Sequence, residues 1–275
     1  PLVYDSMVPA TPDYAIVWAN TGFGLFNKKT KERPALDYTY IADFKNGLAK
    51  VNIGGKITGT VGKRPLVYGG KWGYINKTGK VVVPARYDDV GSYTEQAIAV
   101  RTGDKWGFVD WAGKEIIPQK YESIDIFSEG KAGVKLNGKW GYIDRSYREI
   151  IAPKYEMVYA FNKGMAKVKQ NGLMGLINEK GETIVPSLYD YIGDIVEEGY
   201  ITVTQGKLTG LVRMRTGEEI VAPRYQSIGN FHEGLAVVQR NGLYGYMDIY
   251  GRELIEPRYA YASSIYMGEA SVRDK

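Results

Sequence analysis

One histidine is the sole residue in this sequence that could act as the base of a serine-type hydrolase. The 275 residues contain His232 and no cysteine, and a nucleophilic triad needs an imidazole that a carboxylate orients. Other copies of the internal repeat described below carry Lys45, Thr94, Ser128 and Asn162 at the same position. Side chains so different are typical of a solvated loop, so we expect no catalytic role for His232.

Neighbouring carboxylates could serve a glycosidase, which holds two of them at a fixed separation across a cleft. They occur at Asp88-Asp89, Glu197-Glu198 and Glu218-Glu219. Asp88 of the first pair is a repeat position and the other pairs lie in turn-like sequence, so a carboxylate hydrolase ranks last among the functions considered. The absence of cysteine excludes disulfide bonds and thiolate metal sites. We expect no catalytic residue, no cofactor and no metal.

A glycine-rich segment, 52–70, could cradle a phosphate, but its spacing does not fit. Gly62-Lys63 lacks a glycine five residues earlier, and Gly59 is followed by Thr60 where a phosphate loop has lysine. The segment is instead an insert, because Val51 and Trp72 lie 21 residues apart whereas the corresponding residues of the next copy lie 6 apart. Inserts in repeat arrays fall in loops, often on the binding face.

The composition is that of an ordinary soluble globular protein. Hydrophobic residues make up 44% and charged residues 24%, with a net charge of +5. No apolar run approaches the length of a membrane-spanning helix, so the chain is not expected to span a membrane. The charge excess is too small and too scattered for a protein that coats nucleic acid, and we expect no nucleic-acid partner.

A repeat of about 34 residues organises the chain. Lys71-Trp72-Gly73-Tyr74-Ile75-Asn76 returns as Lys105-Trp106-Gly107-Phe108-Val109-Asp110 and again from Lys139 to Asp144. Weaker copies begin at the aromatic–glycine position of Phe23, Met174, Thr209 and Tyr244, which makes seven units. Each unit contains an Ala-x-Val run, the Trp-Gly run and a β-branched run ending in proline. Asn-Gly at 137–138, 171–172 and 241–242 is the preferred two-residue hairpin turn.

These features predict an all-β protein of seven tandem three-stranded antiparallel meanders, in which the proline ends the third strand. A propeller blade needs about 40–45 residues, and both chain ends carry the same Ala-x-Val strand, at 15–17 and 270–272. We therefore expect an open, curved, solenoid-like array. A closed β-propeller with three-stranded blades is the alternative.

We expect a single domain over residues 1–275. It divides into an N-terminal half unit (1–22), a degenerate repeat (23–51), the glycine-rich insert (52–70), six repeats (71–256) and a C-terminal half unit (257–275). A bare half unit would leave a sheet edge unpaired, so we expect the chain to be a piece of a longer protein.

Two sets of repeat side chains could meet a partner. A basic residue precedes the repeat tyrosine at Arg86, Lys120, Lys154, Arg224 and Arg258. We expect local pairing with the acids two residues on, Asp88, Glu122 and Glu156, which share a face with the cation in an extended chain. The alternative is a basic stripe that faces an anionic polymer. The repeat aromatics should form the core between repeats: Trp72, Trp106, Trp140, Tyr87, Tyr121, Tyr155, Tyr189, Tyr225, Tyr259, Phe127, Phe161 and Phe231.

Three aromatics lie where the repeat calls for small or polar turn residues, namely Trp111, Tyr147 and Tyr250. We expect them to be exposed on the turns and to form a partner-binding site with the insert. The insert would contribute Lys56, Lys63, Arg64 and Tyr68.

The Lys-Trp-Gly-Tyr-Ile-Asn/Asp pattern, followed by Tyr-Asp/Glu and Phe-x-Glu-Gly, resembles the WG repeat family, which is mostly bacterial. The resemblance covers nearly the whole chain and implies a non-catalytic repeat module, often in exported or cell-surface proteins, so we favour an extracytoplasmic location. We predict a non-enzymatic scaffold that binds a protein or peptide through one face of the array. The alternative is a glycan or cell-wall binding module that uses the turn aromatics.

Overall fold

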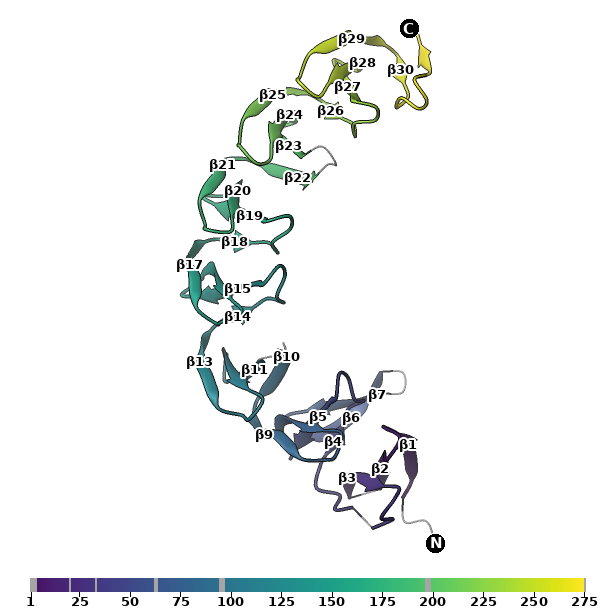
Figure 1. Ribbon diagram of the computed structural model, residues 1–275, viewed down its shortest axis with the longest axis vertical. Coiled ribbons are helices and arrows are strands. Elements are labelled where there is room, and N and C mark those ends of the chain that lie inside the picture. Colours follow the sequence, from purple (N-terminus) through teal and green to yellow (C-terminus); the bar gives the residue numbers. More distant parts are fainter. Residues whose placement is uncertain are drawn as a thin grey trace. The chain divides into compact units, whose positions relative to one another are not determined.

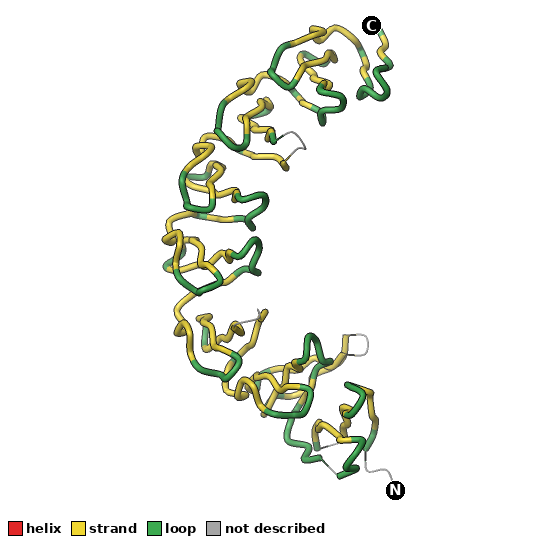
Figure 2. Tube along the Cα trace, viewed as in Figure 1, coloured by secondary structure: helices red, strands yellow, loops and turns green. Residues whose placement is uncertain are grey.

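The computed structural model describes residues 4–19, 21–32, 34–61, 64–93, 97–195 and 199–274. Within them the chain forms strands and turns and no helix (Figure 2), which confirms the all-β prediction. The chain divides into two compact units, which we call unit 1 (residues 1–124) and unit 2 (residues 125–275). No sheet of the described residues combines strands from the two chain ends, as the closing blade of a propeller commonly does.

The repeating element is an antiparallel sheet of four strands in chain order (Figure 1). The strands of the five complete copies are β10 (Asp89–Tyr93), β11 (Ala97–Thr102), β12 (Lys105–Asp110) and β13 (Glu115–Tyr121); β14 (Ser123–Ile124), β15 (Lys131–Leu136), β16 (Lys139–Asp144) and β17 (Glu149–Tyr155); β18 (Met157–Val158), β19 (Met165–Gln170), β20 (Leu173–Asn178) and β21 (Thr183–Tyr189); β22 (Tyr191–Ile195), β23 (Tyr200–Gln205), β24 (Leu208–Arg213) and β25 (Glu219–Tyr225); β26 (Ser227–Ile228), β27 (Leu235–Arg240), β28 (Leu243–Asp248) and β29 (Glu253–Tyr259).

The remaining strands depart from this pattern near the ends of the chain. They are β1 (Ser6–Pro9), β2 (Tyr14–Ala19) and β3 (Gly22–Asn27) in a three-stranded sheet; β4 (Tyr40–Ile41), β5 (Leu48–Ile53), β8 (Lys71–Asn76) and β9 (Val81–Tyr87) in a four-stranded sheet; β6 (Lys56–Val61) and β7 (Arg64–Tyr68) in a hairpin; and β30 (Tyr261–Ala262) with β31 (Val272–Arg273). The insert is therefore a β-hairpin between β5 and β8 and not a loop.

Each complete repeat has one strand more than the predicted three-stranded meander. A short strand follows the repeat tyrosine and pairs with the Ala-x-Val strand, as where Met157 faces Lys169 and Val158 faces Val168. Only one residue separates it from the end of the preceding sheet, Glu156 in this copy. Consecutive sheets are therefore joined without a loop.

The glycine of the Trp-Gly pair is required by a close backbone approach. In β17 the chain bulges through Pro153, so that Trp140 faces Tyr155 while Tyr142 faces Ile151. A Cβ atom on Gly141 would lie 2.3 Å from the carbonyl oxygen of Ile151. The prediction that the proline ends the third strand is wrong, because the bulge carries the strand past it.

The turn predictions are confirmed. Asn137 and Gly138 adopt φ values of 51° and 75°, and the other two Asn-Gly turns are equivalent. In the turn after β12, the Asp110 side chain accepts hydrogen bonds from the backbone N–H groups of Ala112 and Lys114, at 2.8 and 2.9 Å.

Within each unit the core lies between successive sheets, as the aromatic pattern predicts. In unit 2, Tyr142 of one sheet packs in a cluster with Val158 and Phe161 of the next. Its ring lies edge-on to Phe161 at 4.8 Å, and its hydroxyl donates to the carbonyl oxygen of Tyr159 at 2.6 Å. Within unit 2, β17, β21, β25 and β29 lie along one side of the sheets and the β18–β19 and β26–β27 loops along the other (Figure 1).

Candidate functional site

The turn aromatics do not form the exposed set that the sequence indicated. Tyr147 is only 8% exposed and packs edge-on against Phe127 at 5.9 Å. Its φ of 62° confirms that it replaces the turn glycine, and this left-handed conformation lets its ring pack inward. Trp111 is half-buried against the core cluster of its own unit. Tyr250 alone is exposed, at 63%, with the Arg252 guanidinium over its ring.

The insert hairpin is fixed at its base by Asn52, which is fully buried. The Asn52 side chain donates to the carbonyl oxygen of Gly69 and accepts from the backbone N–H of Gly55, both at 3.1 Å. Lys56 and Tyr68 pair at the open end of the two strands near this base and are both exposed. Of the other two predicted residues, Arg64 begins β7 and Lys63 lies outside the described residues.

Arg86 and Lys154 of the basic row do not pair with Asp88 and Glu156, the acids two residues on. Each cation instead lies over the ring of the tyrosine that follows it: at 5.1 Å for Arg86, 4.9 Å for Lys120, 5.1 Å for Lys154, 5.1 Å for Arg224 and 5.0 Å for Arg258. The acids bind hairpin turns, as where Glu156 accepts from the backbone N–H groups of Asn171 and Gly172. The prediction of local pairing is therefore wrong for Arg86 and Lys154.

Of the residues considered for catalysis, Glu197 and Glu198 lie outside the described residues. His232 is exposed in a short turn, where it pairs with Leu235. No group of three or more His, Asp or Glu residues that could hold a metal occurs in the described part of the chain. No helix among those residues could cross a membrane.

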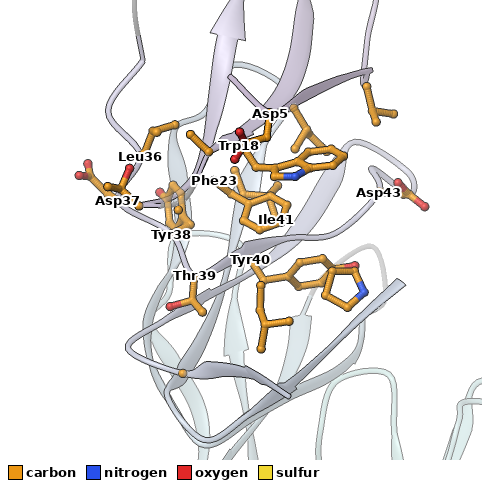
Figure 3. A pocket seen from close by; sticks show the side chains of 18 of the residues that line it. Asp5, Trp18, Phe23, Leu36, Asp37, Tyr38, Thr39, Tyr40, Ile41 and Asp43 are labelled. Atoms are coloured by element: carbon orange, nitrogen blue, oxygen red, sulfur yellow. The ribbon is translucent and has the colours of Figure 1, made fainter. Parts of the chain in front are cut away.

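A cavity of about 920 Å³ lies within unit 1 (Figure 3). Three separate stretches line it: the β1–β3 sheet, the connection from residue 36 to 43, and the insert hairpin. We call it the N-terminal cavity. Its lining residues from the hairpin are Gly55, Ile57, Thr60 and Pro65. The insert hairpin thus forms one wall of the N-terminal cavity.

Aromatic side chains form the floor of the N-terminal cavity. Trp18 stacks on Phe23 with ring centroids 5.6 Å apart and planes at 23°. Tyr40 meets Phe23 edge-on, also at 5.6 Å. Phe23 is 8% exposed and belongs to the core, with Trp18, Tyr38 and Tyr40 packed against the same cluster. The floor is consequently held by the core and is preformed.

The charged residues that line the N-terminal cavity in the described part of the chain are acidic, namely Asp5, Asp37 and Asp43, and each is exposed. Asp37 and Asp43 lie on opposite sides of the aromatic floor in Figure 3. The backbone N–H of Asp5 donates to the carbonyl oxygen of Trp18 at 2.9 Å. Burial raises the pKa of the Tyr38 hydroxyl, and the Asp37 charge raises it further.

Sequence reasoning missed this cavity because its walls are far apart in the chain. One signal was present in the sequence. Phe23 faces Tyr38 as Trp72 faces Tyr87, so Asp37 occupies the position that Arg86 holds in the next copy. The first repeat thus carries an acid where five others carry a cation.

A family model described as a WG containing repeat matches six stretches of the chain, at residues 23–56, 72–106, 106–140, 140–173, 174–208 and 215–244. The seventh unit, from Tyr244, has the same strand pairing, since Tyr244 faces Tyr259. No curated protein matches the chain.

Among solved structures, Hsv2p of Kluyveromyces lactis is similar with a TM-score of 0.35 and 12% identity, over 89% of this chain and 93% of that chain. A eukaryotic initiation factor gives 0.36 and 10%, over 93% and 77%. The extracellular domain of a hybrid two component system from B. thetaiotaomicron gives 0.32 and 12%, over 91% and 39%.

Proposed function

Because the chain belongs to the WG containing repeat family, we propose that it is a non-enzymatic repeat scaffold that binds a protein or peptide partner, and that the N-terminal cavity is its binding site. The observation that carries the proposal is the preformed aromatic floor of a cavity of about 920 Å³. Pockets of this size, apolar with a few polar groups, are the default binding sites of proteins.

The lining suits a peptide side chain with an apolar stem. Ile57 is 48% exposed and Val8 is 41% exposed, and both line the cavity. These aliphatic groups and the Trp18 ring offer apolar surface that gains free energy when a partner covers it. The carboxylates around the floor supply the few polar contacts that fix orientation.

A pair of threonine substitutions on the insert hairpin tests the proposal. Thr60 lines the cavity, whereas Thr58 lies on the same strand outside the lining. Thr60→Trp should fill the cavity, and Thr58→Trp adds the same bulk elsewhere. Twelve-residue peptides selected from a displayed library on the wild-type chain would then be measured on both variants by calorimetry.

We expect the selected peptides to bind the wild type and Thr58→Trp alike and to bind Thr60→Trp at least tenfold more weakly. Equal binding to all three proteins would place the site elsewhere and overturn the proposal. A glycan array read with the same three proteins tests the alternative. If the wild type binds a polysaccharide that Thr60→Trp does not bind, and no peptide is selected, the glycan-binding alternative would replace the proposal of a peptide partner.

A further inference from the structure

The chain itself shows how its fold holds a cation at one repeated position. In five repeats a lysine or arginine lies over the repeat tyrosine, with distances to the ring centroid between 4.9 and 5.1 Å. In three of them the guanidinium also donates to the tyrosine hydroxyl: Arg86 at 2.9 Å, Arg224 at 3.1 Å and Arg258 at 2.9 Å. The ring face and the hydroxyl of the repeat tyrosine together hold the cation, and the distances to the ring are those of a cation–π contact.

The first repeat retains the tyrosine and loses the cation. Tyr38 is the repeat tyrosine, since it pairs with Phe23 as Tyr87 pairs with Trp72. The residue before it is Asp37, and among the residues that the structure describes no cation lies over the Tyr38 ring. Tyr38 is half-buried and lines the N-terminal cavity.

One other repeat lacks the cation, but its repeat tyrosine is buried. Leu188 precedes Tyr189 there, and Tyr189 is only 7% exposed. Its hydroxyl donates to the Glu219 carboxylate at 3.3 Å. The protein's own groups therefore occupy that position, whereas Tyr38 lines a cavity.

The charges around the cavity favour a cation. Asp5, Asp37 and Asp43 line it, and no lysine or arginine does among the residues whose side chains the structure describes, in a chain whose net charge is +5. A cation brought near several carboxylates, with part of its water removed, gains more than it would in bulk water.

The aromatic floor is less suited to a sugar. Trp18 has one face stacked on Phe23, and Phe23 is 8% exposed with Tyr40 edge-on to it. A sugar ring stacks on a broad open aromatic face, whereas a cation needs one accessible ring face and a nearby carboxylate.

We infer that the N-terminal cavity takes an arginine or lysine side chain of a partner segment, which lies over Tyr38 beside Asp37 and replaces the cation that the other repeats supply from their own chain. This inference rests on the proposed function and specifies the chemistry of its ligand. The aliphatic stem of the ligand residue would lie along Ile57 and Pro65, which line the same cavity.

Four end-blocked hexapeptides that differ only at their central residue test the charge requirement. The central residue is arginine, lysine, citrulline or glutamate, and binding to the full chain is followed by fluorescence anisotropy. We expect the arginine peptide to bind at least tenfold more tightly than the citrulline peptide, which has the same shape without the charge. Asp37→Asn should weaken the arginine peptide at least fivefold, while Asp104→Asn, an exposed acid of the same unit outside the lining, should not.

A second substitution tests the position itself. Asp37→Arg restores the residue type that the other repeats carry, so we expect the chain to fold and the new side chain to cover Tyr38. Binding of the arginine peptide should then be lost. Leu188→Arg makes the same kind of change at the equivalent position of another repeat and should leave binding unchanged.

The outcomes separate this inference from the proposed function. If citrulline and arginine peptides bind equally and Thr60→Trp removes both, the cavity binds peptides and the cation inference is wrong. If Asp37→Arg, correctly folded by circular dichroism, binds the arginine peptide as the wild type does, the position over Tyr38 is not used and the inference also fails. If neither basic peptide binds at millimolar concentration, the inference is overturned, whatever the displayed library selects.

Discussion

The carboxylate of Glu129 accepts a hydrogen bond from the backbone N–H of Gly164, 35 residues further along the chain, at 2.9 Å. Its other oxygen accepts from Lys163 at 2.8 Å. Lys163 and Gly164 form the corresponding turn of the next repeat, with φ values of 51° and 76°. The acid of one Phe-x-Glu-Gly turn thus caps the next turn, and the same contact recurs between Glu233 and Gly268.

Glu129→Gln should therefore destabilise unit 2. The amide can accept from only one of the two N–H groups through its oxygen, and it loses the charge that strengthens both bonds. We expect a loss of about 0.5–1.5 kcal/mol in the free energy of unfolding, measured by urea denaturation. Glu269→Gln, an exposed glutamate of the same unit, is the matched control. An equal effect in both variants would mean that the cap contributes nothing specific.

Gly141→Ala should be more damaging, because the new methyl group would lie 2.3 Å from the backbone oxygen of Ile151 and could be relieved only by moving the β17 bulge. We expect a loss of about 2 kcal/mol or more in thermal or urea unfolding. Gly229→Ala provides the comparison, since its nearest neighbour would be the carbonyl oxygen of Val237 at 3.4 Å. Equal stability of the two variants would show that the bulge yields easily.

The side chain of Asp88 should give unit 1 a pH-dependent stability. A hydrogen bond from the Lys71 ammonium lowers the pKa of the Asp88 carboxyl most, and a bond from the Gly103 N–H lowers it further. The distances are 2.5 and 2.7 Å. Because the pKa is lower in the folded chain, the ionised group stabilises the fold above its unfolded pKa of about 3.9.

That contribution is lost as the pH falls through the folded pKa of Asp88. The urea midpoint of the wild type should exceed that of Asp88→Asn by a constant amount above about pH 5. The difference should shrink below about pH 4. A difference that stays the same down to pH 2 would contradict the assignment, since protonation of Asp88 would then cost nothing.

Asn52→Ala should loosen the insert hairpin at its base. The change removes a buried donor and acceptor and leaves the Gly69 carbonyl and Gly55 N–H without their side-chain partner. Amide hydrogen exchange of β6 and β7 should become faster, and peptide binding in the N-terminal cavity should weaken because one wall is less ordered. Exchange of β12 and β13 is the internal reference. Unchanged hairpin protection would show that the strand pairing alone holds this wall.

The sequence was informative where local chemistry decides the structure. Asn137-Gly138 predicts its hairpin turn because both residues must adopt positive φ. The fourth strand could not be predicted, since a two-residue strand such as β18 shows no alternation. The burial of Tyr147 was also beyond prediction, because it depends on the Phe127 ring of the same repeat approaching a left-handed turn.

The N-terminal cavity was predictable in part. Its walls come from Asp5, the 36–43 connection and the insert hairpin, and their meeting is a tertiary event that no local pattern encodes. The insert was recognised as a departure with a functional meaning. The acid at Asp37 in the position of a repeated cation was visible in the sequence, but its meaning depended on knowing that the cation lies over the tyrosine ring.

The one-residue junction between sheets has a mechanical consequence. In unit 2, β17 and β18 are separated by Glu156 alone, and β21 and β22 by Asp190 alone. A single residue spans at most about 3.6 Å. When the two ends of this unit are pulled apart, the connections between sheets therefore cannot extend. The first lengthening under tension must come from rupture of strand pairing or of the packed core. Such a unit would resist small forces stiffly and then lengthen in steps, one sheet at a time.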